Sequence, residues 1–454
     1  MGEEKIEELK GKVYEAYIQR TIKSREMFER ACMSLAGGVC GNLRYLQPYP
    51  LYMTRGRGSK MWDVDGNEYI DCFLNNGPLL LGHCHPEVME EIRQESERGL
   101  LIYNSDLGVR CAESLKEVIP CAERVRFANS GTEAVMFAVR IARAFTGKNK
   151  IIKFYGHYHG QDDPFLIGTS TINDEASSLG VPKANLGNTI LLRYGRVEEV
   201  TRKLNEDADI AGIILDPQMS MGGIFPAGTE YLGELRRLTK ERGIPLIFDE
   251  VITGFRLALG GAQEYFGVTP DLACYSKSVA AGAKFAAVVG SKEIMDCLVP
   301  GSPFTQRGDR RVAFQSGTYN DGVEGIAGAI AAIKTYKRLR QKGEYEKLHE
   351  KAERLAKDIE GAFKIRKIGC HVNYLGSSLK MFITDLEPSF EAYSKLDHTV
   401  RFLFFLSLVS QGILLSWPSV GSVFLSFVHT DRDMERIIEG VNMSLEKYKF
   451  EEVL

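Results

Sequence analysis

Several features that mark other protein classes are missing from this sequence. Its nine cysteines include no C-x-x-C pair, which argues against a disulfide framework or a zinc cluster. No apolar run is long enough to span a bilayer; the most membrane-like stretch, residues 402–409, predicts a buried helix or strand instead. The N-terminus is charged and lacks the apolar core of a signal peptide. We therefore expect a cytoplasmic protein without a membrane partner.

An excess of one charge sign is also missing. The chain has 57 basic and 60 acidic residues, a formal net charge of −3, which gives no bulk reason to expect a nucleic-acid partner. Hydrophobic residues make up 44% of the sequence, as in an ordinary globular protein. A chain of 454 residues has room for two domains with cores of their own.

What the chain does contain is a repeated alternation of short apolar runs, loops and helix-like segments between about residues 76 and 320. This pattern predicts an α/β fold with a mostly parallel sheet covered on both faces. We expect an N-terminal helix and hairpin segment (1–75), a large domain (76–334) and a smaller α+β C-terminal domain (335–454). Residues 325–348 are expected to form one helix that leads into the last of these.

Two polar residues follow apolar runs in this pattern. Asp249 ends the run 244–248, and Lys277 follows the run 270–275. Ligands of parallel sheets gather at the carboxyl ends of the strands. An acid at one strand end and a lysine at another meet the needs of a pyridoxal 5′-phosphate (PLP) enzyme: the amine forms an imine with the cofactor aldehyde, and the carboxylate keeps the ring nitrogen protonated. Alone the pair is weak evidence, because both residue types are common.

Two further segments have both a functional and a purely structural interpretation. Ser130, Gly131 and Thr132 stand where a helix is expected to begin, a position that suits a phosphate group but equally an ordinary N-cap. In the loop after the apolar run 151–154, Tyr158 lies between His157 and His159. One of these rings could stack on a cofactor. The two histidines give only weak support for a metal site, because no third ligand follows at a recognisable spacing.

The order of these motifs resembles that of the class III aminotransferases, PLP enzymes of fold type I, and most of all their glutamate-1-semialdehyde 2,1-aminomutase branch. The likeness is carried by residues 129–134, Tyr158-His-Gly160, residues 249–256, Lys277 and Gly317-Thr318. It is good over about residues 30–330 and looser in the C-terminal domain. The resemblance implies small amine or amino acid and carbonyl substrates.

The resemblance also assigns roles to individual residues. It implies that Lys277 carries the cofactor and moves the proton, and that Asp249 pairs with the ring nitrogen. The other implied contacts are Ser130, Gly131 and Thr132 with the cofactor phosphate, Tyr158 and Val251 with the two ring faces, Thr318 with the phosphate of a neighbouring subunit, and Arg44 with a substrate carboxylate. The role of Thr318 implies a homodimer with shared active sites. For Arg44, an exposed surface arginine is an equally weighted alternative.

Some positions depart from the pattern of the family. Met221 replaces a polar residue expected near the cofactor hydroxyl, and residues 280–283 are rich in alanine where the family has glycines. Gly421 stands where the aminomutase branch has an acid, with Trp417 nearby. These departures favour an aminotransferase over an aminomutase. A racemase or epimerase and a catalytically silent protein of the same fold remain open, as does whether residues 168–188 form a wall or a lid.

Overall fold

The computed structural model describes residues 2–170, 172–226, 228–300, 312–416 and 421–453. It divides the chain into two units, one formed by residues 86–345 and the other by residues 1–85 together with 346–454. The N-terminal segment therefore shares a unit with the C-terminal part of the chain. None of the described helices is long and apolar enough to cross a membrane.

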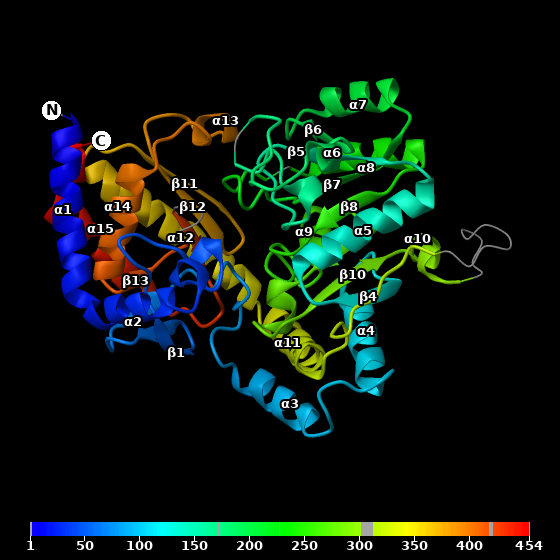
Figure 1. The fold of residues 1–454 in the computed structure, drawn as a ribbon, viewed down its shortest axis with the longest axis horizontal. Coiled ribbons are helices and arrows are strands. Elements are labelled where there is room, and N and C mark those ends of the chain that lie inside the picture. Colours follow the sequence, from blue (N-terminus) through cyan, green and yellow to red (C-terminus); the bar gives the residue numbers. More distant parts are fainter. Residues whose placement is uncertain (1, 171, 227, 301–311, 417–420, 454) are drawn as a thin grey trace. The chain divides into compact units, whose positions relative to one another are not determined.

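The unit of residues 86–345 is built on a seven-stranded sheet with the order β4-β10-β9-β8-β7-β5-β6 (Figure 1). Strand β10 is antiparallel to both of its neighbours, and the other described pairs in this sheet are parallel. The strands are β4 (Arg124–Ala128), β5 (Lys150–Phe154), β6 (Thr189–Leu192), β7 (Ile210–Leu215), β8 (Leu246–Asp249), β9 (Leu272–Tyr275) and β10 (Ala286–Gly290). Strands β7 to β10 are buried along their whole length, as expected for a sheet covered on both faces.

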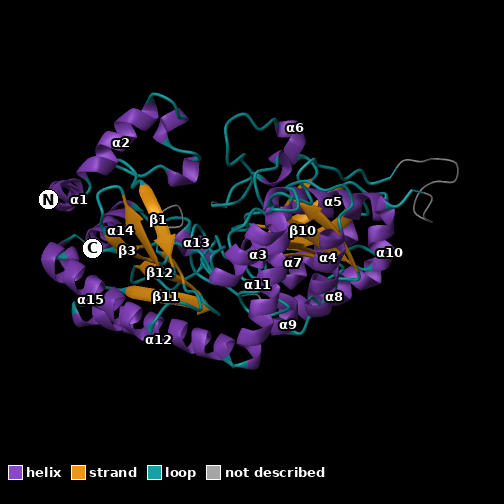
Figure 2. Cartoon of the chain, turned by 90° about the horizontal axis from the view of Figure 1, so that it is seen from below, coloured by secondary structure: helices purple, strands orange, loops and turns teal. Residues whose placement is uncertain are grey.

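Helices surround this sheet (Figure 2). They are α3 (Pro86–Ser96), α4 (Asp106–Val118), α5 (Gly131–Thr146), α6 (Lys183–Leu186), α7 (Val197–Glu206), α8 (Thr229–Arg242), α9 (Ala262–Phe266), α10 (Lys292–Met295) and α11 (Val323–Gln341), with short 3₁₀ turns η3 (Asp163–Phe165), η4 (Lys277–Ala280) and η5 (Asp296–Leu298). Helix α5 packs across β4, β7, β9 and β10. Its buried residues, from Ala134 to Ala142, recur at helical spacing and form one core with the strands beneath.

The second unit contains two smaller sheets, one of order β1-β2-β3-β13 and an antiparallel one of order β11-β12-β14. Its strands are β1 (Met53–Arg57), β2 (Lys60–Asp63), β3 (Glu68–Asp71), β11 (Cys370–Leu375), β12 (Ser378–Ile383), β13 (Ile413–Leu414) and β14 (Ser422–Phe424). Its helices are α1 (Gly2–Arg20), α2 (Ile22–Cys32), α12 (Glu344–Ile365), α13 (Phe390–Tyr393), α14 (Thr399–Ser410) and α15 (Asp431–Tyr448), with 3₁₀ turns η1 (Ala36–Gly38), η2 (Asn42–Arg44) and η6 (Phe450–Glu452). Helices α1, α14 and α15 pack on one another.

Two helical segments can be compared directly with what the sequence predicts, residues 325–348 and residues 402–409. The single helix expected over residues 325–348 is wrong, because α11 ends at Gln341 and α12 begins at Glu344. Gly343 between them has a φ of +67°, a left-handed conformation that ends a helix and that glycine adopts without a steric penalty. The apolar stretch 402–409 is the buried core of α14, so the helix alternative is the one that the structure adopts.

Candidate active site

The carboxyl ends of two neighbouring strands bring the predicted acid and lysine to one edge of the large sheet. Asp249 is the last residue of β8 and is in register with Cys274 of the parallel strand β9. Lys277 begins η4, just after β9 ends at Tyr275. Its backbone has a φ of +49°, a strained conformation for a residue with a side chain. Because β8 and β9 are adjacent and parallel, the two residues lie at the same edge.

The Asp249 carboxylate is fixed by two donors. The His159 Nδ1–H group donates to Oδ2 of Asp249 at 2.7 Å, and the Val251 backbone N–H donates to Oδ1 at 3.1 Å. Both the aspartate and the histidine are buried. Sequence reasoning named His159 but did not assign it this partner. Its position in the loop directly after β5 could have indicated this contact, because β5 belongs to the same parallel sheet and its carboxyl end lies at the same edge as that of β8.

Burial makes the Lys277 amine unusually easy to deprotonate. It lowers the pKa of Lys277 to about 8, and the positive charge of Arg256 acts in the same direction, whereas the Asp249 and Asp216 carboxylates oppose the shift. Arg256 is fully buried, and burial lowers its pKa to about 10. A lysine with this pKa supplies free amine near neutral pH, as a nucleophile or general base requires.

We expect this pKa to be visible in chemical labelling. In the cofactor-free protein, the rate at which trinitrobenzenesulfonate modifies Lys277, followed by peptide mass spectrometry, should rise with pH through a midpoint near 8, because only the neutral amine reacts. In an Asp249→Asn variant the midpoint should fall further, since this carboxylate raises the pKa of Lys277. A midpoint near the ordinary lysine value of 10.5 would contradict the assignment.

The beginning of α5 forms the second part of the site. Ser130 is the N-cap, and its Oγ accepts the Glu133 N–H at 3.3 Å, while the Glu133 carboxylate accepts the Asn129 N–H at 2.7 Å. A Cβ added to Gly131 would lie 3.0 Å from the Val251 side chain, so the start of the helix packs directly on the residue that follows Asp249-Glu250. The N–H groups and the positive dipole end of this 16-residue helix are therefore next to the Asp249 strand end.

Close packing also joins the helix start to the loop after β5. A Cβ at Gly160 would lie 2.5 Å from Thr132 Oγ1, and the Gln161 N–H donates to that hydroxyl at 3.2 Å. Tyr158, in the same loop, is partly exposed at 39%. Burial of its inner part raises the pKa of the Tyr158 hydroxyl, and the charge of Asp249 adds to the shift, which indicates that the two side chains are close. Val251 and Tyr158 thus lie close to Asp249, and the start of α5 packs on Val251 through Gly131 and on Gly160 through Thr132.

The loop after β7 lines the same edge with polar groups. The Asp216 backbone N–H donates to Nδ1 of His157 at 3.0 Å, and the Asp216 carboxylate accepts the N–H groups of Gln218 and Ser220. Burial and the negative charge of Asp249 raise the pKa of Asp216. Burial is also the main reason why the pKa of His157 lies well below its ordinary value. This imidazole is therefore neutral, with its proton on Nε2.

Several buried polar atoms in the loops after β5 and β7 have no partner among the described residues. They are Nε2 of His157, Nε2 of His159 and both side-chain amide atoms of Gln218. Buried polar groups are normally hydrogen-bonded, so their concentration here indicates a site that a polar ligand completes. A lysine with free amine, a fixed carboxylate and a helix N-terminus fit the aldehyde, ring nitrogen and phosphate of PLP.

A metal site receives no support from the two histidines. The His157 ring bonds a backbone N–H group, and the His159 ring bonds a carboxylate. In the part of the chain that the structure describes, no three His, Cys, Asp or Glu side chains are arranged to hold a metal ion.

Both of the remaining predicted residues, Thr318 and Arg44, are exposed. Thr318 is exposed in a turn whose Asn320 side chain accepts a hydrogen bond from Asn129 Nδ2 at 2.8 Å. Arg44 is exposed in η2 of the other unit, so its role stays a prediction. Gly421 has a φ of +82°, and a Cβ there would lie 2.7 Å from the Met381 carbonyl oxygen, which explains why glycine suits this position. Trp417 lies outside the described residues.

Comparisons with known proteins agree with this geometry. The family model "Aminotransferase class-III" matches residues 44–369. The chain is 37% identical to the glutamate-1-semialdehyde 2,1-aminomutase of Natranaerobius thermophilus, covering 94% of this chain and 99% of that protein. It is similar to the structure of an omega-transaminase from Sphaerobacter thermophilus, with a TM-score of 0.86 and 29% identity over 94% of this chain and 98% of the other. A transaminase structure with PLP bound has a TM-score of 0.86 and 28% identity over 95% and 99% of the two chains.

The fold and site define a PLP-dependent enzyme of fold type I. This chain belongs to the class III aminotransferase family. The predictions of the fold class, of the family and of PLP as cofactor are confirmed.

Proposed function

We propose that this chain transfers an amino group by PLP chemistry with Lys277 as the residue that carries the cofactor and moves the proton, and Asp249 as the partner of the ring nitrogen. The observation that carries the proposal is a pair of residues at neighbouring strand ends. The Asp249 carboxylate at the end of β8 is held by His159 and the Val251 N–H, and Lys277, just after β9, has a pKa of about 8. Bound PLP supplies an aldehyde and a ring that accepts electrons from the substrate carbon.

The chain's own residues then divide the work. The N–H groups and hydroxyls of Ser130, Gly131 and Thr132 hold the phosphate at the start of α5. Val251 and Tyr158 bracket the ring. The neutral fraction of the Lys277 amine accepts a proton from the substrate carbon and then donates it to a different atom. A general base works best when its pKa is near the working pH. Arg44 is the candidate for a substrate carboxylate.

Two reactions are compatible with these residues, an aminomutase and an aminotransferase reaction, and the similar proteins favour the aminomutase. In an aminomutase the amino group moves between two carbons of one substrate, and the relative described above, 37% identical over nearly its whole length, bears this name. In an aminotransferase a separate donor and acceptor exchange the group. Gly421, which stands where the aminomutase branch has an acid, and the likeness to an omega-transaminase keep this second reaction as the alternative.

One experiment separates the two reactions. The PLP-loaded protein is supplied with glutamate-1-semialdehyde alone, and the isomer in which the amino group has moved from carbon 2 to carbon 1 is measured by chromatography. Formation of the isomer without any acceptor supports the aminomutase. Absence of the isomer, together with transfer from an ω-amine or amino acid donor to an added carbonyl compound, supports the aminotransferase. If a broad panel of donors and acceptors gives neither product, the proposal fails.

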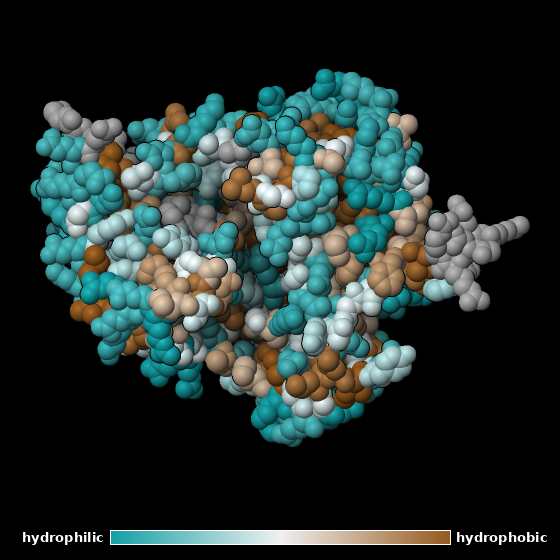
Figure 3. Space-filling model, viewed as in Figure 1, coloured by the Kyte–Doolittle hydropathy of each residue, from teal (hydrophilic) through white to brown (hydrophobic). Residues whose placement is uncertain are grey.

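We also propose that two copies of this chain form a dimer through the connection between α3 and α4. Apolar side chains are exposed there, with Leu100 at 55%, Leu101 at 49% and Tyr103 at 93%. Apolar surface gathers near α4 in Figure 3. Phe314 and Tyr319 on either side of Thr318 are also exposed, at 69% and 60%. An exposed apolar patch of this kind is typical of a protein interface.

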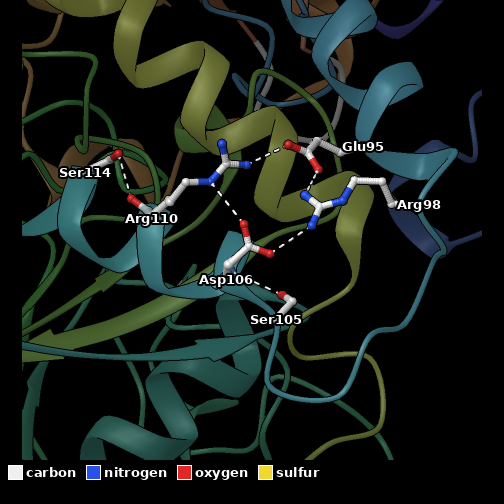
Figure 4. A network of polar contacts seen from close by, with 7 residues as sticks. Glu95, Arg98, Ser105, Asp106, Arg110 and Ser114 are labelled. Carbon is white, nitrogen blue, oxygen red and sulfur yellow. Dashed lines mark hydrogen bonds and ion pairs between the residues drawn. The ribbon is translucent and has the colours of Figure 1, made fainter.

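An ionic network holds this connection in place (Figure 4). Arg98 donates to Glu95 at 2.7 Å and to Asp106 at 3.0 Å, and Arg110 donates to Glu95 at 2.6 Å. These contacts tie the end of α3 to the start of α4. The apolar residues between the two helices are therefore presented by a braced loop, as a preorganised interface requires.

The dimer can be tested with a charge in the patch. We expect the double variant Leu101→Glu, Tyr103→Asp to run as a monomer in light scattering coupled to size exclusion, because burying two unpaired charges is unfavourable. It should lose most of its activity as well, since the active sites are shared. Lys240→Glu, on the exposed side of α8, is the matched control and should remain dimeric. A monomeric wild-type protein would contradict the proposal outright.

A further inference from the structure

The unit of residues 1–85 and 346–454 contains a buried lysine that the proposed reaction does not use. Lys380 lies in the middle of β12 and has no exposed surface. Its Nζ donates to Oγ of Ser422 at 3.3 Å and lies 5.0 Å from the centre of the Tyr393 ring. Neither contact supplies a negative charge, and lysine is almost never fully buried without one.

A buried arginine accompanies this lysine. Arg401, in the first turn of α14, is 3% exposed. Its Nη2 donates to the Asp397 backbone oxygen at 2.9 Å, while Nη1 is buried and has no partner among the described residues. The nearby Asp397 carboxylate accepts the Thr399 N–H at 2.8 Å instead. The guanidinium therefore has a donor that the described part of the chain leaves unused.

The basic groups are close enough to repel one another. Burial lowers the pKa of Lys380 well below its ordinary value, and the charge of Arg401 adds to the effect. At the rim, the exposed His398 packs edge-on against Tyr393, with 5.8 Å between ring centres. Burial, Arg401 and Lys380 all lower the pKa of His398, and Asp397 alone opposes them. Buried charges of one sign are costly unless a counter-charge is present.

We propose that Lys380 and Arg401 bind a small oxyanion, a carboxylate or a phosphate group, between β12 and the start of α14. Nη1 of Arg401 and the Lys380 ammonium donate to its oxygens, Ser422 adds its hydroxyl, and Tyr393 forms an apolar wall. An arginine fork beside a lysine point charge is a common way to hold such groups. This inference does not depend on the proposed reaction, because it concerns neither Lys277 nor the strand ends around it.

His398 serves as a reporter for this site. The PLP-loaded protein, with histidine ring carbons labelled by ¹³C, is titrated with pH by NMR in chloride, in inorganic phosphate and in acetate at constant ionic strength, and His398→Gln identifies the signal. A bound anion offsets the two positive charges, so the midpoint of His398 should rise saturably with phosphate, acetate or both. Constant ionic strength removes the contribution of screening, and the ion that acts tells the phosphate and carboxylate classes apart.

Two variants and a control complete the test. Lys380→Met and Arg401→Met should each weaken the anion effect roughly tenfold or more, as expected for the loss of one charge-assisted hydrogen bond. Lys395→Met, exposed in the same segment, should leave it unchanged. No saturable shift in the wild-type protein, or the same shift in Arg401→Met, overturns the proposal. The wild-type titration decides the question even if a variant fails to fold.

Discussion

Replacing Lys277 with Ala is expected to remove the covalent link to PLP and to lower turnover by about 10⁴-fold or more, because the nucleophile and the proton carrier are lost together. Absorbance of the purified protein and mass spectrometry after borohydride treatment report the link, and substrate consumption reports turnover. The expected effect is large because Lys277 lies at a strand end beside Asp249 and its pKa of about 8 makes it both a nucleophile and a base near neutral pH.

The controls for this variant separate chemistry from folding. Lys277→Arg keeps the positive charge but cannot form the link, so it should be as inactive as the alanine variant. Lys292→Ala removes a lysine at the start of α10 whose side chain is 60% exposed and pairs with Asp296 of η5, and it should behave like the wild type. A cofactor still attached in Lys277→Ala would show that another amine carries it and would sink the assignment.

Replacing Asp249 with Asn is expected to leave PLP bound while turnover falls by about 10³-fold, equivalent to roughly 4 kcal/mol in the barrier. The amide keeps the shape of the side chain but no longer stabilises a protonated ring nitrogen, so the ring accepts electrons poorly. The KM for the substrate should change little in comparison. Stopped-flow measurement of the first half-reaction separates this loss from weaker binding.

His159 gives an independent check on the same prediction. His159→Phe removes the donor that holds Asp249 at 2.7 Å and should cost activity in the wild-type background. In an Asp249→Asn background its additional effect should be much smaller, because residues that act as one unit are not additive. Asp358→Asn, at an exposed position of α12, serves as a control for loss of a carboxylate. Normal turnover in Asp249→Asn would refute the proposed role.

The sequence predicts the strands of the large sheet well for a physical reason. Buried parallel strands are continuous apolar runs, as in 244–248, and the polar residues that follow them stand out. The order of the strands depends instead on which helices cross the sheet. Asp249 and His159 meet only because β8 and β5 lie on either side of β7 in the same parallel sheet, so that their carboxyl ends point the same way. A histidine in a loop gives no sign of its partner until this order is known.

Other features escaped prediction for local reasons. One helix was expected over residues 325–348 because the pattern there is helical throughout; the left-handed conformation of Gly343, which divides it into two helices, is not visible in that pattern. Nothing in the sequence around Lys380 indicates that the Tyr393 ring and Arg401 of α14 lie near its side chain. Arg44 was found by its resemblance to family members, and such a resemblance carries no information on where the side chain lies.

The backbone of Lys277 has one more implication. A side chain at φ +49° costs about 1 kcal/mol or more in local strain, and glycine would remove that cost. Selection for thermal stability alone would therefore drive this position toward the residue that abolishes the reactive amine. A library of this protein screened by heat resistance should accumulate glycine here among its inactive members, and activity would have to be selected together with stability to retain the lysine.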